Sequence, residues 1–111
     1  MQGFHIRVAA QCDAVSQKMR KLVSQLRLNE LDNYARLVER VADDAARLSM
    51  RAIREPGPRA EQVANLCSLQ SRLLRELRDR LLEASLSTLA AWAEEGADVL
   101  GGLAAYASEQ R

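Results

Sequence analysis

Residues 54–62 read REPGPRAEQ and contain both prolines of the chain, Pro56 and Pro58, with Gly57 between them. Proline lacks the backbone N–H that an inner helical turn needs, so a helix does not run through this stretch. On each side lies a long run rich in Leu, Ala, Arg and Glu, a composition typical of long helices. The stretch therefore predicts an all-α chain that reverses once near its middle.

The whole chain of 111 residues fits a single helical domain. We expect a short tail at residues 1–7 and a first helical arm at 8–54. A turn at 55–58 then leads into a second helical arm at 59–108. Pro58 suits the first turn of that second helix.

The first arm shows two apolar series, within residues 8–26 and 31–52, each with alternating three- and four-residue spacings. The two series differ in phase, and the slip falls within residues 27–34. Either the helix breaks there and Asn29 caps a new helix, or one helix continues on an 11-residue repeat. Because no Gly or Pro interrupts residues 8–54, we favour a continuous, kinked helix.

The second arm carries two neighbouring apolar stripes instead of one. A hairpin partner covers one stripe of a helix, so the wider face needs another subunit, a third helix or an apolar phase. The residues expected to form this apolar surface or oligomer interface are Leu74, Leu77, Leu81, Leu82, Leu86, Leu89, Trp92, Ala93, Val99, Leu100, Leu103 and Tyr106.

The two ends of the chain carry opposite charge. Residues 1–28 hold five Lys/Arg against one Asp, and residues 83–111 hold five acidic residues against one Arg. An antiparallel helical hairpin sets these ends side by side. A lone hairpin of two long helices has little core, so we expect it to assemble into a dimeric or tetrameric bundle or coiled coil.

The sequence offers little catalytic chemistry, and we predict that the protein is not an enzyme and needs no cofactor or metal. His5 stands alone in the expected solvated tail, away from other residues with metal-ligand spacing. Cys12 and Cys67 lie on apolar stripes, where a thiol acts as a small hydrophobic group. Adjacent acids such as Asp43 and Asp44 diverge on a helix and do not form an acid/base pair.

Composition also narrows the expected partners and location. The net charge is +1, and acidic residues interleave with the arginines of residues 71–83, so we expect no nucleic-acid partner. The N-terminus lacks a signal-peptide pattern, and no apolar run reaches the roughly 20 residues of a transmembrane helix. Two cysteines do not make a disulfide framework. These features predict a cytoplasmic protein.

Residues 31–107, from LDNYARLVERV to VLGGLAAY, resemble a phasin, with an Ala/Leu-rich helix, the break REPGP, and a helix opening with AEQVANLCSLQSRLL. Phasins are bacterial proteins that coat polyhydroxyalkanoate storage granules. The resemblance implies a non-catalytic coat protein that lays its apolar stripe on the polymer. The residues expected at that contact are Leu82, Leu86, Leu89, Trp92, Ala93, Leu100 and Leu103. The same stripe is equally suited to holding an oligomer together.

A second hypothesis is a coiled-coil interaction or helper protein, such as a small component or chaperone of a bacterial secretion system. Small secreted hairpin proteins of one type carry a WxG turn motif. Here the turn is EPGP, and Trp92 is followed by Ala-Glu-Glu-Gly. The sequence therefore disfavours that type and leaves the wider class of helical interaction proteins open.

Overall fold

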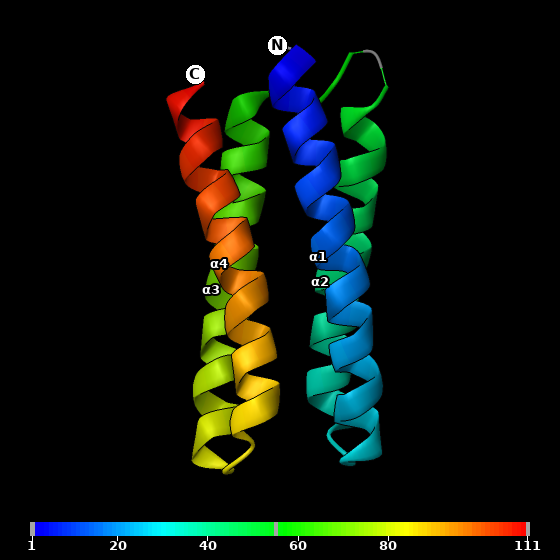
Figure 1. Cartoon of the computed structure of the whole chain (residues 1–111), viewed down its shortest axis with the longest axis vertical. Helices are drawn as coiled ribbons and strands as arrows, with labels where there is room; N and C mark the ends of the chain where they lie inside the picture. Colours follow the sequence, from blue (N-terminus) through cyan, green and yellow to red (C-terminus); the bar gives the residue numbers. More distant parts are fainter. Residues whose placement is uncertain (1, 55, 111) are drawn as a thin grey trace.

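The computed structural model of the chain describes residues 2–54 and 56–110, and over these residues it is built from four α-helices (Figure 1). They are α1 (Gln2–Leu28), α2 (Asp32–Ala52), α3 (Ala60–Glu83) and α4 (Ser87–Glu109). The all-α prediction is confirmed. The prediction of one two-helix hairpin is wrong, because each expected arm is itself a hairpin.

The first arm breaks at residues 29–31 by a Schellman motif. Glu30 adopts a left-handed backbone with φ of 60°. The N–H of Leu31 donates to the carbonyl of Leu26 at 2.9 Å, and the N–H of Glu30 donates to that of Arg27 at 3.0 Å. The continuous helix that we favoured is therefore wrong. Asn29 also caps no new helix, since the N-cap residue of α2 is Leu31.

The second arm breaks in the same way at residues 84–86, where the sequence predicts no interruption. Ser85 takes the left-handed position with φ of 63°. The N–H of Leu86 donates to the carbonyl of Leu81 at 2.9 Å, and the N–H of Ser85 donates to that of Leu82 at 3.0 Å. Both motifs use a leucine pair at their closing hydrogen bond, and neither uses glycine.

The stretch REPGPRAEQ contains most of the hinge that connects the two hairpins. Glu55 lies outside the described residues; Pro56 is exposed and Pro58 is buried. Helix α3 begins at Ala60 with Arg59 as its N-cap residue, so Pro58 precedes the helix instead of occupying its first turn. The hinge therefore ends one hairpin and starts the next, which differs from the single turn that we expected.

The segment expected as a tail is helical from Gln2, although Met1 lies outside the described residues. His5, expected to be solvated, is half-buried against the hinge. Its Nε2 lies 3.2 Å from the carbonyl oxygen of Pro58. A Cβ added at Gly57 would lie 2.5 Å from the His5 ring, so glycine allows this close approach. The start of α1 thus braces the hinge.

The four helices pack side by side into a bundle that is 42 Å long, 21 Å wide and 17 Å thick between Cα extremes (Figure 1). Helix α1 packs along α2, and α3 packs along α4. The two hairpins meet mainly through α1 and α4, which occupy the front of Figure 1. Helices α2 and α3 also neighbour each other but approach only sparsely.

The core lies between the two hairpins and contains side chains from all four helices. Met19, Leu22 and Leu26 enter it from α1, and Leu74 and Leu100 enter it from α3 and α4, all fully buried. Many of its other members are alanines, which let the helices approach closely. The bundle therefore buries within one chain much of the apolar surface for which we expected an oligomer.

The basic α1 lies beside the acidic α4, as the opposite charges of the chain ends suggest. The ammonium group of Lys18 forms an ion pair with the carboxylate of Glu95. The guanidinium of Arg7 lies 4.0 Å from the ring centroid of Tyr106, a cation–π distance. Exposed ion pairs contribute only about 0–1 kcal/mol each, so this match of charges adds little to the stability of the bundle.

Candidate functional site

Most residues predicted to form an apolar surface lie inside the bundle. Leu82 and Val99 are the members with substantial exposure, at 52% and 39%. Leu86, Trp92 and Tyr106 are half-buried and pack against the core. The others are buried, namely Leu74, Leu77, Leu81, Leu89, Ala93, Leu100 and Leu103. The α1–α2 hairpin covers the wide face of the second arm within the same chain.

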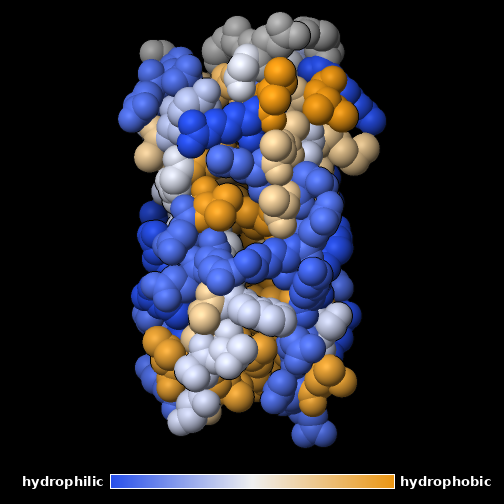
Figure 2. Space-filling model, viewed as in Figure 1, coloured by the Kyte–Doolittle hydropathy of each residue, from blue (hydrophilic) through white to orange (hydrophobic). Residues whose placement is uncertain are grey.

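The face formed by α1 and α4 is mostly hydrophilic. Figure 2 shows this side, with hydrophobic residues gathered in the seam between the helices and at the two ends of the bundle. The ion pair between Lys18 and Glu95 crosses the seam. Among the residues that the structure describes, this side of the molecule presents no broad apolar surface.

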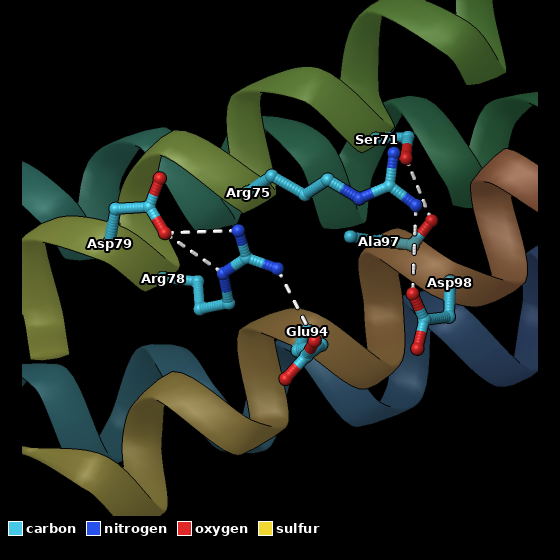
Figure 3. A network of polar contacts seen from close by, with 7 residues as sticks. All are labelled: Ser71, Arg75, Arg78, Asp79, Glu94, Ala97 and Asp98. Atoms are coloured by element: carbon cyan, nitrogen blue, oxygen red, sulfur yellow. Dashed lines mark hydrogen bonds and ion pairs between the residues drawn. The ribbon is translucent and has the colours of Figure 1, made fainter.

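A network of polar contacts closes the seam between α3 and α4 (Figure 3). The Ser71 hydroxyl donates to the Ala97 carbonyl at 2.8 Å. The guanidinium of Arg78 reaches Glu94 at 3.2 Å, and that of Arg75 reaches Asp98 at 3.6 Å. These contacts join the middle of α3 to the middle of α4.

The seam between α2 and α3 is different, because it opens into a groove with a cavity of about 480 Å³. Leucines from both helices line it, and Leu69 on the α3 side is 49% exposed. Within residues 2–54 and 56–110, no hydrogen bond or ion pair joins α2 to α3 across it. We call this feature the α2–α3 groove, and its full lining is Asn33, Arg36, Leu37, Arg40, Val41, Asp44, Leu66, Leu69, Gln70 and Leu73.

The α2–α3 groove continues toward the end of the bundle that carries the two Schellman turns. There it passes between Tyr34 and Leu37 on one side and Leu73 and Leu77 on the other. A further hollow ends between Asp32 and Arg80, at that end. The two helices are thus separated by shallow space over much of their length.

Gln70 lies on the floor of the α2–α3 groove and is 2% exposed. Neither its Oε1 nor its Nε2 has a hydrogen-bond partner among the residues that the structure describes. A buried polar group without a partner costs roughly 1–3 kcal/mol, and buried amides in native proteins are usually satisfied. Among the described residues, Gln70 is therefore the one buried side chain whose polar atoms are left without a hydrogen-bond partner.

The walls of the groove carry charged side chains that form no ion pair within the described residues. Arg36, Arg40 and Asp32 line it from α2, and Glu76 and Arg80 line it from α3. All of them are exposed, and none forms an ion pair within the described residues. Elsewhere, α3 arginines pair with α4 and α1 arginines pair with α2.

The two cysteines meet in the core, although they come from helices at opposite corners of the bundle. Cys12 of α1 and Cys67 of α3 are both fully buried and not disulfide-bonded. The side-chain hydrogen bond with Cys67, followed by burial, raises the pKa of Cys12 above its ordinary value. No Cα of α1 lies within 8 Å of a Cα of α3 in the described helices. A disulfide needs Cα atoms about 4.4–6.8 Å apart, so the two thiols lie near each other without the backbone geometry for a bond.

The described residues contain no cluster of three or more His, Cys, Asp or Glu side chains suited to hold a metal ion. None of the helices in that part of the chain is long and apolar enough to cross a membrane. The chemical resources of the groove are apolar walls, guanidinium and carboxylate groups, and one amide.

Sequence reasoning missed the α2–α3 groove, although one signal marks it. Val63, Cys67, Gln70, Leu74, Leu77 and Leu81 follow alternating spacings of four and three, so Gln70 occupies a core position of the heptad pattern. A polar residue at such a position often specifies the partner and register of a helix.

Comparison with protein-family models, with curated proteins and with solved structures finds no match for this chain.

Proposed function

We propose that this protein is a non-catalytic interaction protein that docks a helical surface of a protein partner in the α2–α3 groove. The observation that supports the proposal is the groove itself, with the unpartnered amide of Gln70 on its floor. The proposal corresponds to the helper-protein hypothesis drawn from the sequence, and assigns the binding to a different surface.

Apolar burial supplies the driving force for docking. Leu69 is half exposed, and Leu37, Leu66 and Leu73 are only partly buried. Covering apolar surface gains about 25 cal/mol per Å² removed from water. An amphipathic helix laid in a groove is a common recognition mode, with anchors spaced three or four residues apart. The open seam between α2 and α3 offers such a groove.

The test uses a fluorescein-labelled synthetic helix, with leucine at its heptad core positions and mixed Glu and Lys on its flanks. Fluorescence anisotropy should show saturable binding to the wild-type protein and strongly reduced binding to Leu69→Glu. Leu82→Glu is the matched control, since Leu82 lies on the same helix, is 52% exposed and is not among the groove residues. Equal binding to both variants, or no binding to the wild type at concentrations where it is monomeric, would count against the groove.

Coating of polyhydroxyalkanoate granules is a second proposal, and the two-hairpin architecture favours one form of it. The expected contact residues Leu89, Ala93 and Leu100 are buried between the hairpins. Contact with polymer would therefore require the α1–α2 hairpin to separate from α3–α4, while each hairpin stays intact. The hinge at residues 53–59 is the only covalent connection between them, so such opening needs no helix to break. This proposal places the protein in the bacterial cytoplasm, on the granule surface.

Co-sedimentation with polyhydroxyalkanoate particles tests this second proposal. Binding should shift the emission of the half-buried Trp92 to shorter wavelength. Leu69→Glu should still bind particles, because the groove is not the polymer contact. An unchanged Trp92 spectrum without co-sedimentation would sink the granule proposal and leave the groove proposal untouched.

A further inference from the structure

The amide of Gln70 defines what its partner must offer. A glutamine side chain carries an acceptor oxygen and a donor NH₂ group, and both are unpaired among the described residues. A second amide in reversed orientation satisfies both at once. Because both amide atoms are buried in the free chain, an amide of a second copy reaches them only after the Gln70 side chain turns toward the mouth of the groove.

The unused charges of the groove are complementary to one another. Arg36 borders the groove beside Leu37 and Leu73, the leucines that also flank Glu76, so Arg36 and Glu76 lie at one height on opposite walls. Asp32 and Arg80 form a second such level, at the end of the groove. Each wall thus carries both signs, and at each level the walls are opposite in charge.

A two-fold axis parallel to the bundle places α2 of one copy over α3 of the other at the same height. This arrangement brings Arg36 against Glu76 of the second copy, and Asp32 against Arg80 of the second copy, each pair occurring twice by symmetry. A two-fold axis across the bundle would instead set α2 against α2 and α3 against α3, so Arg36 would no longer face Glu76 of the second copy. Charge therefore selects the parallel axis.

The face has the dimensions of a stable dimer interface. The bundle is 42 Å long and 21 Å wide, and α2 and α3 together span its rear face in Figure 1. A standard interface buries about 800 Å² on each partner, which a face of this length and width can supply. Its apolar groove and polar walls also match the usual arrangement of an apolar centre inside a charged rim.

We propose that the occupant of the α2–α3 groove is a second copy of this chain, joined about a two-fold axis that runs parallel to the bundle. This inference rests on the proposed function, since it names the partner of the same groove. The dimer is an eight-helix assembly in which the four pairs of opposite charge flank an apolar centre.

Charge reversal combined with mixing tests the proposal by sedimentation equilibrium. Arg36→Glu and Glu76→Arg each replace two attractions by two repulsions in the dimer. Each should therefore weaken self-association by roughly 10- to 30-fold relative to the wild type. A one-to-one mixture of the two variants should restore dimers, because all the reversed charges then face opposite partners. Both residues are exposed and unpaired within the described chain, so neither change disturbs the fold.

The possible results separate this inference from the function on which it rests. A wild-type protein that stays monomeric would overturn the second copy as occupant, while binding of the synthetic helix would still support the groove as a docking site. Single variants that associate like the wild type, or a mixture that stays monomeric, would also overturn the dimer. Failure of both the synthetic helix and self-association would remove the proposed function as well.

Discussion

Replacing Gln70 by methionine should stabilise the free protein. The two polar atoms of the amide are buried, with no partner among the described residues, and such a group costs roughly 1–3 kcal/mol. Methionine keeps the unbranched shape and adds apolar contact with the groove leucines. We expect the free energy of unfolding to rise by about 1–2 kcal/mol, which raises the melting temperature by roughly 5–10 °C in a domain of this size.

The measurement is urea unfolding followed by far-UV circular dichroism. It should be made in an Arg36→Glu background, which removes the proposed self-association and so isolates the stability of one bundle. The midpoint should rise at constant m value, since the surface exposed on unfolding hardly changes. Ser71→Ala is the matched control. The buried Ser71 hydroxyl donates to the Ala97 carbonyl at 2.8 Å, and its loss should cost about 1 kcal/mol.

The free energy of unfolding should rise for Gln70→Met and fall for Ser71→Ala, so the two neighbouring buried residues give a decisive comparison. If Gln70→Met left the midpoint unchanged or lowered it, the amide would be satisfied in the free protein. The argument that Gln70 is held ready for a partner would then fail. A protein that keeps a destabilising group in its core commonly does so at a binding site, where stability is traded for function.

Other parts of the fold give further expectations. Glu30→Gly and Ser85→Gly should each raise the free energy of unfolding by roughly 1 kcal/mol, because both residues hold a left-handed backbone that glycine adopts without strain; a lower urea midpoint would contradict the Schellman geometry. Gly102→Ala should add about 1 kcal/mol, since nothing lies within 4 Å of the added Cβ on this exposed helical position; thermal melts would show no gain if the site were crowded. Oxidised glutathione should not link Cys12 to Cys67 in the folded protein, because α1 and α3 are too far apart at their Cα atoms. Intact mass under non-reducing conditions would refute this by revealing a monomer lighter by two hydrogen atoms.

The hydrophobic pattern predicted helix content and the position of the hinge, because both depend on local chemistry. It failed at the two Schellman turns. A left-handed residue is most often glycine, but here Glu30 and Ser85 take that position, and the closing leucines also fit a continuous apolar stripe. The phase slip at residues 27–34 is the signal in the sequence that corresponds to the first Schellman turn. The prediction from the sequence places no break at residues 84–86 and so treats the second hairpin as one helix.

The candidate site could be predicted only in part, for a related physical reason. A wide apolar face on a helix shows that something covers it, but does not say whether the cover comes from the same chain. The α1–α2 hairpin provides that cover, and surface that the sequence assigns to a partner becomes core. The open seam depends on how far apart two helices lie, which no local pattern records. Only the glutamine within the heptad pattern of α3 pointed toward it.

The hinge at residues 53–59 determines how the chain responds to proteolysis and how its fragments reassemble. Most close approaches in the bundle lie within one hairpin, and the hairpins are joined covalently only by this short segment. A protease that cuts at the exposed residues around Pro56 would therefore produce two fragments, each of which contains a complete pair of helices. Because the core between them is apolar and continuous, the fragments should remain associated as a nicked complex. Expressed separately, they would make a split protein whose reassembly reports directly on the strength with which one hairpin holds the other.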